Sequence, residues 1–278
     1  MHIVVLVKPV PDTASSGERL RPDGRLDRAA VPAVVNANDE YALEAALKLV
    51  EAHGGEITIV SMAPAGATDT MRKALAMGAT RGVLVTDEAL AGADHVTTVK
   101  VLAAALSGAD HSSTVQVLAA ALSGLEYDLV LAGADTSDGQ GGVVGAGVAV
   151  LTGVPYLSYA SKIEPDPEAR QVRVRRISPT GYDVLEAALP ALVVCTQALG
   201  EPRYPSLKGI MAARSKEIVT KSLQDLGFEA GSVGGAVATT TLVGSVAPPP
   251  RAATRVVREA PDAAAREIVA FLAERRII

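Results

Sequence analysis

The sequence predicts an open, mainly parallel α/β sheet with helices on both faces. Along most of the 278 residues, short β-branched runs alternate with segments of helical periodicity, which is typical of a sheet built from strand–helix units. Residues 129–132 are apolar throughout, as expected of a strand that is buried on both faces. Hydrophobic residues make up 49% of the chain but aromatic residues only 3%. The core must therefore pack Ala, Val and Leu, which suits helices that lie closely on a Val-rich sheet.

The first half of the chain supplies strands and helices in alternation. Its strands are expected at residues 3–7, 56–62 and 82–86. A helix should begin near Asn38 or Asp39, because both residue types are good N-caps and apolar residues follow at helical spacing. A second helix, at about residues 67–77, should end at Gly78, since glycine is common just after a helix.

The second half continues this pattern. Its strands are expected at residues 128–132, 171–177 and 191–196. The helix after the first of these strands should end at Gly153, and a last amphipathic helix is expected at about residues 262–275. Residues 231–250 are Gly-rich and end in three prolines, which is typical of an extended arm. We therefore predict one α/β domain, residues 1–230, followed by a C-terminal arm and helix, residues 231–278.

A tandem duplication occupies residues 94–124. The sequence Val-Leu-Ala-Ala-Ala-Leu-Ser-Gly at residues 101–108 recurs 16 residues later. Sixteen residues make about four and a half helical turns, so one continuous helix would not keep the same face inward across both copies. Two short helices, or one helix and a looped-out copy, are the expected structures. A duplication tolerated at the surface is favoured over an added interaction element.

Composition and charge exclude several classes of protein. A single Cys cannot form a disulfide within the chain. The 26 Lys and Arg residues against 31 Asp and Glu do not make a nucleic-acid binder by bulk charge. The first apolar run is too short to span a bilayer, and no export signal is recognisable. We therefore expect a cytoplasmic protein without membrane insertion.

No constellation of residues predicts an enzyme. The four histidines form no His-x-x-x-His or Cys–His pattern, and no Gly-x-Ser-x-Gly occurs. Cys195 ends an apolar strand and is interpreted as a small buried residue. The arginines of residues 170–176 alternate with valines and are interpreted as the solvated side of a strand. The sequence predicts no bond chemistry by this chain and no metal site.

The Gly-rich loop after residue 132 is the best local signal of a binding site. In open α/β sheets, ligands bind beyond the carboxyl ends of the strands. Gly139, Gly141 and Gly142 precede a helix, whose N-terminus favours negative charge. Neither a G-x-G-x-x-G after the first strand nor a P-loop motif occurs. From these residues alone, an anion site and a plain turn are equally good interpretations.

Residues 201–216 form a second unusual segment. Two prolines and Leu207 stand in a polar loop before a helix that carries Arg214 and Lys216. An exposed Leu at such a place is a plausible docking anchor. From the residues alone, a Leu packed into the core at the loop–helix junction is the favoured alternative.

Taken together and in this order, five motifs resemble the β subunit of electron transfer flavoprotein over nearly the whole chain. They are VKPVPD at residues 7–12, residues 36–44, RKALAMGA at residues 72–79, TSDG at residues 136–139, and EPRY through GIM at residues 201–211. The last of these is the most specific. The resemblance implies a Rossmann-like, adenine-nucleotide-binding sheet in a non-enzymatic electron carrier that pairs with an α subunit.

The resemblance also implies two cofactors. AMP would be buried in this chain, and FAD would be held mainly by the α subunit, with Thr13 and Asn38 of this chain close to it. The AMP contacts carried over to this sequence are Leu6, Asn36, Ala37, Asn38, Asp39, Met62, Gly133, Thr136, Ser137, Asp138, Gly139, Gln140, Gly141, Gly142, Val143 and Val144. The phosphate would meet main-chain N–H groups from Gly141 to Val144, and Asp138 would bond the ribose or orient the loop.

Protein partners are implied in the same way. Residues 204–216 resemble a recognition loop in which Leu207 enters a pocket on a dehydrogenase of the acyl-CoA dehydrogenase type, and this favours docking over the core interpretation. The partner-facing residues would be Tyr204, Leu207, Ile210, Met211, Arg214 and Lys216. The C-terminal arm and helix would wrap onto the α subunit. Electrons would pass to electron transfer flavoprotein-quinone oxidoreductase and the respiratory chain, as in fatty acid β-oxidation.

Two departures from the family pattern leave alternatives open. Ile177 replaces a Glu that usually faces an arginine of the α subunit near the flavin, whereas Glu186 is retained. The duplication is the second departure. One alternative is a bifurcating type, in which a second FAD replaces AMP. The other is a stand-alone adenine-nucleotide-binding sensor without redox work.

Overall fold

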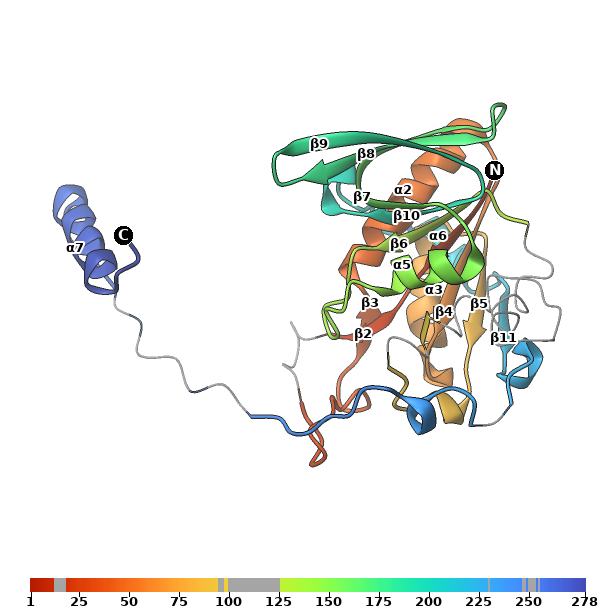
Figure 1. The fold of residues 1–278 in the computed structure, drawn as a ribbon, viewed down its shortest axis with the longest axis horizontal. Helices are drawn as coiled ribbons and strands as arrows, with labels where there is room; N and C mark the ends of the chain where they lie inside the picture. Colours follow the sequence, from red (N-terminus) through yellow and green to blue (C-terminus); the bar gives the residue numbers. More distant parts are fainter. Residues whose placement is uncertain are drawn as a thin grey trace. The chain divides into compact units, whose positions relative to one another are not determined.

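The computed structural model describes residues 1–12, 19–94, 98–99, 126–229, 231–246, 249, 254 and 256–278. The chain divides into two compact units, Met1–Leu242 and Val243–Ile278. The first unit has an open, mostly parallel sheet flanked by helices (Figure 1), so the predicted fold class is confirmed.

A nine-stranded sheet forms the centre of the first unit, in the order β11-β5-β4-β1-β6-β10-β7-β8-β9. Neighbouring strands run parallel from β11 to β7, and β8 and β9 are added antiparallel. The strands are β1 (His2–Leu6), β4 (Glu56–Met62), β5 (Arg81–Val85), β6 (Leu129–Gly133), β7 (Tyr156–Asp166), β8 (Gln171–Ser178), β9 (Gly181–Ala188), β10 (Ala191–Cys195) and β11 (Ile218–Lys221). The predicted strands of the parallel part are thus confirmed to within a residue or two.

Helices cover both faces of this sheet. Alternate residues of the central strands enter two separate hydrophobic clusters, because successive side chains of a strand point to opposite faces. Helices α2 (Ala37–His53) and α3 (Thr68–Met77) contribute to one cluster, and α5 (Val144–Thr152) contributes to the other. Helix α6 (Leu207–Ala213) packs on α3.

The smaller elements surround this framework. Two short strands, β2 (Pro9–Pro11) and β3 (Ala33–Val35), pair antiparallel in a sheet of their own. The 3-10 helices are η1 (Ala65–Ala67), η2 (Glu88–Leu90), η3 (Gln197–Leu199), η4 (Gln224–Leu226) and η5 (Gly235–Val237).

The predicted helix boundaries are largely confirmed, with one correction. Helix α2 begins at Ala37 with Asn36 as its N-cap, so Asn38 and Asp39 lie in the first turn instead of capping it. Helix α3 ends before Gly78, where φ is 145°. A Cβ at that position would lie 2.5 Å from Leu47 Cδ2, so glycine serves both the turn and the close packing on α2.

Strands β7, β9 and β11 of the large sheet were not predicted. No residue of β9 is buried, so β9 lacks the apolar alternation by which a half-buried strand is recognised. The predicted strand β8 is present, and Arg173 and Arg175 are exposed on it, which confirms the interpretation of a solvated side. Arg173 pairs with Glu186 of β9 at 2.9 Å.

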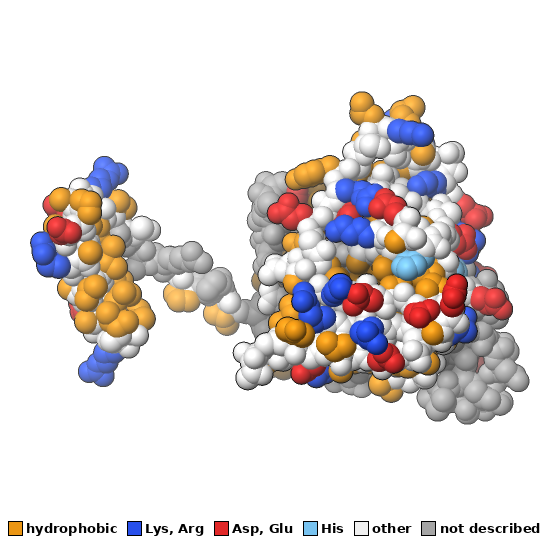
Figure 2. Space-filling model, turned by 90° about the horizontal axis from the view of Figure 1, so that it is seen from above, with side chains coloured by type: hydrophobic (Ala, Val, Ile, Leu, Met, Phe, Trp, Pro, Cys, Tyr) orange, Lys and Arg blue, Asp and Glu red, His pale blue; other side chains and the backbone are white. Residues whose placement is uncertain are grey.

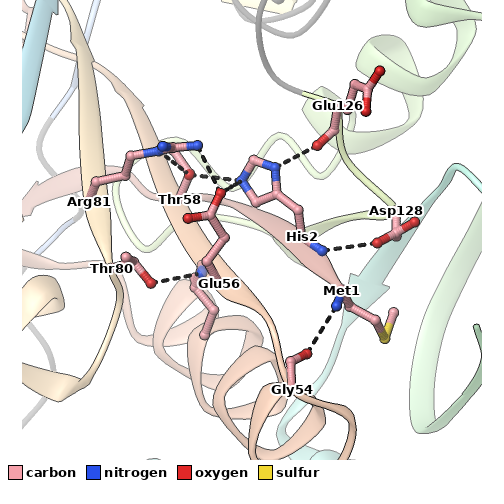
Figure 3. A network of polar contacts seen from close by, with 10 residues as sticks. Met1, His2, Gly54, Glu56, Thr58, Thr80, Arg81, Glu126 and Asp128 are labelled. Carbon is pink, nitrogen blue, oxygen red and sulfur yellow. Dashed lines mark hydrogen bonds and ion pairs between the residues drawn. The ribbon is translucent and has the colours of Figure 1, made fainter.

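A polar network joins the amino-terminal ends of the central strands (Figure 3). His2 Nδ1 donates to the carbonyl oxygen of Glu126 at 2.6 Å, and His2 Nε2 lies 2.9 Å from Thr58 Oγ1. Arg81 donates to Thr58 Oγ1 and to Glu56 Oε1, each at 3.0 Å. This network lies at the opposite edge of the sheet from the loops that follow the strands.

The second unit contains helix α7 (Pro261–Glu274), which confirms the predicted last helix. No residue of α7 is buried, and Ile268 and Val269 are 49% and 54% exposed. Hydrophobic side chains gather along this helix (Figure 2). No described residue of the second unit therefore covers the apolar side of α7.

Two further predictions concern segments between these elements. The duplicated segment 94–124 lies almost wholly outside the described residues. Residues 231–242, predicted as the start of the arm, belong to the first unit, where Val233 is buried and Gly235 N donates to Ala91 O. No helix in the described ranges is long and apolar enough to cross a membrane.

Candidate functional site

A cavity of about 740 Å³ lies beyond the carboxyl ends of β1, β4, β5 and β6. This is the edge of an open α/β sheet at which ligands bind. Its walls come from residues that directly follow these strands, from the start of α5 and from the segment around η2. The predicted contacts that line the cavity are Leu6, Asp39, Met62, Gly133, Thr136, Gly139, Gly141, Gly142 and Val144.

The other predicted contacts do not line this cavity. They are Asn36, Ala37, Asn38, Ser137, Asp138, Gln140 and Val143. Thr13 lies outside the described residues. Several of these side chains instead hold the loop after β6 in place, and this role was not foreseen for the Asn residues.

Asn36 and Asn38 tie this loop to the start of α2. The buried Asn36 donates to Asp135 O at 2.8 Å and accepts from Ser137 N at 3.2 Å. Asn38 also donates to the carbonyl and the carboxylate of Asp135. Asn36 makes no side-chain capping bond to α2. Its amide therefore fixes the loop instead of satisfying the helix.

Asp138 is buried against Lys8 and Arg28, two cations that line the cavity. Its side chain is 2% exposed, its Oδ1 lies 2.8 Å from Lys8 Nζ, and its Oδ2 contacts Arg28 Nη2. Burial by itself would raise the pKa of Asp138, but the bonds from Lys8 and Arg28 outweigh it and hold the pKa at about 2. Both carboxylate oxygens are thus occupied by cations from distant segments.

Asp39 presents a buried carboxyl at the cavity wall. Its Oδ2 accepts from Lys8 N at 2.8 Å. A Cβ at Gly133 would lie 2.4 Å from Asp39 Oδ1, so the Asp39 carboxyl can occupy this position only because residue 133 is a glycine. Burial raises the pKa of Asp39 to about 7, although the hydrogen bond from Lys8 opposes the rise. The charge of this wall therefore changes near neutral pH.

The N-terminus of α5 lies at the cavity, and the main-chain N–H groups of its first turn have no partners within the helix. Its N-cap, Val143, makes no side-chain capping bond, and Gly141, Gly142 and Gly145 line the cavity. A Cβ at Gly145 would lie 2.9 Å from Val194 Cγ2, so the glycine lets α5 lie directly on β10. The first-turn N–H groups and the helix dipole suit an anionic group such as a phosphate.

Sequence reasoning missed the wall that follows β5. Asp87, Glu88 and Asp94 line the cavity there. Asp87 Oδ1 accepts from Ala89 N at 3.0 Å as the cap of η2, and Asp94 Oδ2 accepts from Thr239 N at 2.6 Å. No motif marks these residues. Only the rule that ligands bind beyond strand ends could have drawn attention to Asp87.

A second candidate surface lies at α6. Tyr204, Leu207 and Met211 are 95%, 84% and 62% exposed, so Leu207 is not a core residue and the core interpretation is wrong. Ile210 and Arg214 are also exposed. Lys216, in contrast, turns inward and donates to main-chain carbonyls of α3 and of the residues after it.

The interpretation of Cys195 as a small buried residue is confirmed. Cys195 is completely buried, and burial together with the nearby Asp39 raises the pKa of its thiol far above the usual range. Such a thiol is unreactive at neutral pH. The described residues contain no group of three or more side chains that could hold a metal ion.

Comparison with known proteins identifies the family. The family model "Electron transfer flavoprotein domain" matches residues 23–111 and 104–226. "Electron transfer flavoprotein subunit beta" of Mycobacterium tuberculosis is 36% identical over 282 residues, which cover 100% of this chain and 99% of that protein. The chain belongs to the electron transfer flavoprotein family. The resemblance carried by the five motifs is thereby confirmed.

Further relatives extend this result. "Electron transfer flavoprotein subunit beta" of Clostridium acetobutylicum is 35% identical over 235 residues, or 84% of this chain and 83% of that protein. "Protein FixA" of Azorhizobium caulinodans is 37% identical over 231 residues, or 82% of this chain and 78% of that protein. The chain is thus similar to members of the family that carry different names.

Proposed function

We propose that this chain is the β subunit of a heterodimeric electron transfer flavoprotein, with AMP in the cavity and a share in holding the FAD of an α subunit. The observation that carries the proposal is the cavity beyond β1, β4, β5 and β6, with the N-terminus of α5, which has no side-chain cap, in its wall. Family membership supports the carrier subunit over a stand-alone sensor.

The residues around the cavity fit an adenine mononucleotide. Its volume of about 740 Å³ is within the range of small-molecule sites. Leu6, Val60 and Met62 offer apolar surface for a base, and the first turn of α5 offers N–H donors for a phosphate. Asp138, with both oxygens bound to cations, would orient the loop instead of bonding the ribose.

In this proposal, the chain carries out no redox chemistry with its own side chains. When bound, FAD supplies the redox chemistry. The residues of this chain bind the nucleotide, exclude water from it and shape the surfaces that meet other proteins. Ile177, 44% exposed on β8, is proposed to face the α subunit.

Two surfaces are assigned to protein partners in this proposal. The docking segment, residues 204–216, would meet a dehydrogenase of the acyl-CoA dehydrogenase type through its exposed apolar residues. The uncovered apolar side of α7 would bind the α subunit. Electrons would then pass to electron transfer flavoprotein-quinone oxidoreductase and the respiratory chain, with the carrier working in the cytoplasm.

The bound nucleotides test the cofactor assignment. The chain is co-expressed with its α subunit, and nucleotides are extracted from the purified heterodimer and quantified. One FAD and one AMP per heterodimer are expected. Two FAD and no AMP would establish the bifurcating alternative, and a stable homo-oligomer that does not bind an α subunit would favour the sensor.

Electron uptake tests the docking assignment. In Leu207→Ala, electron transfer from a reduced acyl-CoA dehydrogenase should slow while the flavin content of the heterodimer stays normal. Val150→Ala, which shortens a similarly exposed apolar side chain on α5 (77% exposed), is the matched control. Equal transfer rates in the two variants would contradict the anchor role of Leu207.

A further inference from the structure

Arg203, which directly precedes the docking segment, binds that end of the segment to α2. Its Nε donates to Glu44 Oε2 at 2.8 Å, and its Nη2 donates to Glu44 Oε1 and Glu51 Oε2, each at 3.1 Å. The main-chain N of Arg203 also donates to Glu44 Oε2 at 3.1 Å. Glu44 and Glu51 are two helical turns apart on one face of α2, so one guanidinium bridges both.

The contact with Glu44 is the buried part of this fastening. The Glu44 side chain is 5% exposed, whereas that of Glu51 is 56% exposed. Burial by itself would raise the pKa of Glu44, but the bonds from Arg203 outweigh it and lower the pKa. Without the guanidinium of Arg203, the buried carboxylate of Glu44 would lose its main partner.

The end of the docking segment is fastened to α3 by Lys216. Its Nζ donates to Leu75 O at 3.0 Å and to Ala79 O at 2.6 Å, at the C-terminal end of α3, where the helix dipole favours a cation. Arg72 of α3 reinforces this contact by donating to Ala213 O at 2.7 Å and to Lys216 O. Partial burial lowers the pKa of Lys216.

Between the two fastenings, α6 lies in close contact with α3. A Cβ at Gly209 would lie 2.3 Å from Ala76 O, so only glycine permits this approach. Helix α6 has seven residues, too few to be stable without such contacts. The most exposed side chains, Tyr204, Leu207 and Met211, make none of these bonds.

We infer that Arg203 and Lys216 are positioning residues, which hold the docking segment in its binding shape before a partner protein arrives. The inference rests on the proposed docking function of this segment. Fixing the segment in advance removes an ordering cost from association. The residues that would contact the partner, such as Leu207, are then different from the residues that hold the docking segment in its conformation.

Hydrogen exchange measures the shape without any partner. Both variants are studied in the purified heterodimer. Arg203→Lys keeps the positive charge but loses the bidentate guanidinium. Lys216→Met keeps the apolar part of the side chain but loses the Nζ donor. Both should speed amide exchange of residues 206–213 by roughly tenfold or more. Lys73→Met, the same change at an exposed position on α3, and Leu207→Ala should leave exchange unchanged.

Steady-state kinetics measure the consequence for docking. With an acyl-CoA dehydrogenase reduced by its acyl-CoA substrate as the probe, both positioning variants should raise the KM for the dehydrogenase at least about threefold with kcat unchanged. Flavin content and thermal midpoint serve as checks that each variant is folded. Arg203→Lys should retain more of the exchange protection than Arg203→Met.

The outcomes separate the two proposals. If Leu207→Ala raises KM while Arg203→Lys and Lys216→Met leave KM and exchange unchanged, the inference is overturned and the docking function stands. If exchange becomes faster in both variants but KM stays unchanged, the positioning role is likewise overturned. If Leu207→Ala leaves KM unchanged, the proposed docking function is wrong and the inference falls with it.

Discussion

Asp138 organises the loop after β6 from a buried position. Its partners Lys8 and Arg28 are 130 and 110 residues away in the chain, so one carboxylate joins three segments around the cavity. The cations are partly exposed, with side chains 39% and 44% accessible. A charged hydrogen bond of this kind contributes more than a neutral one.

We predict that Asp138→Asn lowers the free energy of unfolding by about 2 kcal/mol and reduces the AMP content of the heterodimer. The native pKa of about 2 lies below the ordinary value of 3.8, so the charged form is stabilised by folding. This contribution is fully present above pH 4 and is lost as the pH falls towards 2. Urea unfolding of both proteins at pH 7 and pH 3 checks it, and an equal difference at both pH values would contradict it.

Asp39 shows the opposite behaviour. Its native pKa of about 7 lies above the ordinary value of 3.8, so the folded protein keeps a proton that the unfolded chain has lost in this range. The contribution of Asp39 to the free energy of unfolding should therefore decline as the pH rises from 4 to 7, by at most about 1.4 kcal/mol per pH unit.

We predict that Asp39→Asn removes this decline, because the amide is neutral at every pH and can still accept from Lys8 N. Relative to the wild type, the variant should gain stability between pH 5 and pH 8. Urea unfolding midpoints across this range measure the difference. Parallel pH profiles would show that Asp39 keeps an ordinary pKa.

At the level of elements, the cavity depends on how closely α5 lies on the sheet. Gly145 is in the first turn of α5, and a Cβ there would lie 2.9 Å from Val194 Cγ2 of β10 and 3.5 Å from Leu192 Cδ2. An added methyl group must push the helix N-terminus away from the strand ends. The donors offered to an anion would move with it.

We predict that Gly145→Ala destabilises the protein by about 1–3 kcal/mol through overpacking and lowers its AMP content. Gly66→Ala is the control, since nothing lies within 4 Å of a Cβ at that position. It should change stability by less than about 1 kcal/mol. Thermal unfolding and nucleotide extraction report both effects, and equal behaviour of the two variants would contradict the packing argument.

At the level of the whole molecule, the two units differ in what holds them together. Residues 1–242 contain both hydrophobic clusters of buried residues. Within residues 243–278, helix α7 has 14 residues and none of them is buried. An isolated helix of this length is marginally stable in water, so α7 is expected to gain its stability from a partner.

We predict that a chain ending at Leu242 keeps the urea midpoint of the full chain but no longer co-purifies with the α subunit. The core that determines global unfolding is unchanged, whereas the apolar side of α7 is lost. Co-expression followed by size-exclusion chromatography measures assembly. Normal heterodimer formation by the shortened chain would show that the arm is dispensable.

The sequence by itself determined the fold class, most strands of the parallel part and the family. These features depend on local chemistry, so they can be predicted from the sequence pattern. Examples are the uniformly apolar strand at residues 129–132 and the helix ends at Gly78 and Gly153. The place of the Gly-rich loop followed from the rule that ligands bind beyond strand ends. Strand β9 escaped prediction because none of its residues is buried.

Only the tertiary structure decided which way the side chains of the site point. Asn36 fixes the loop instead of capping α2, Asp138 binds two cations of the cavity wall, and Lys216 turns towards α3. Each of these side chains is chemically able to make several bonds. The bond that forms depends on which distant segment lies beside it, and that juxtaposition exists only once the sheet has brought the segments together.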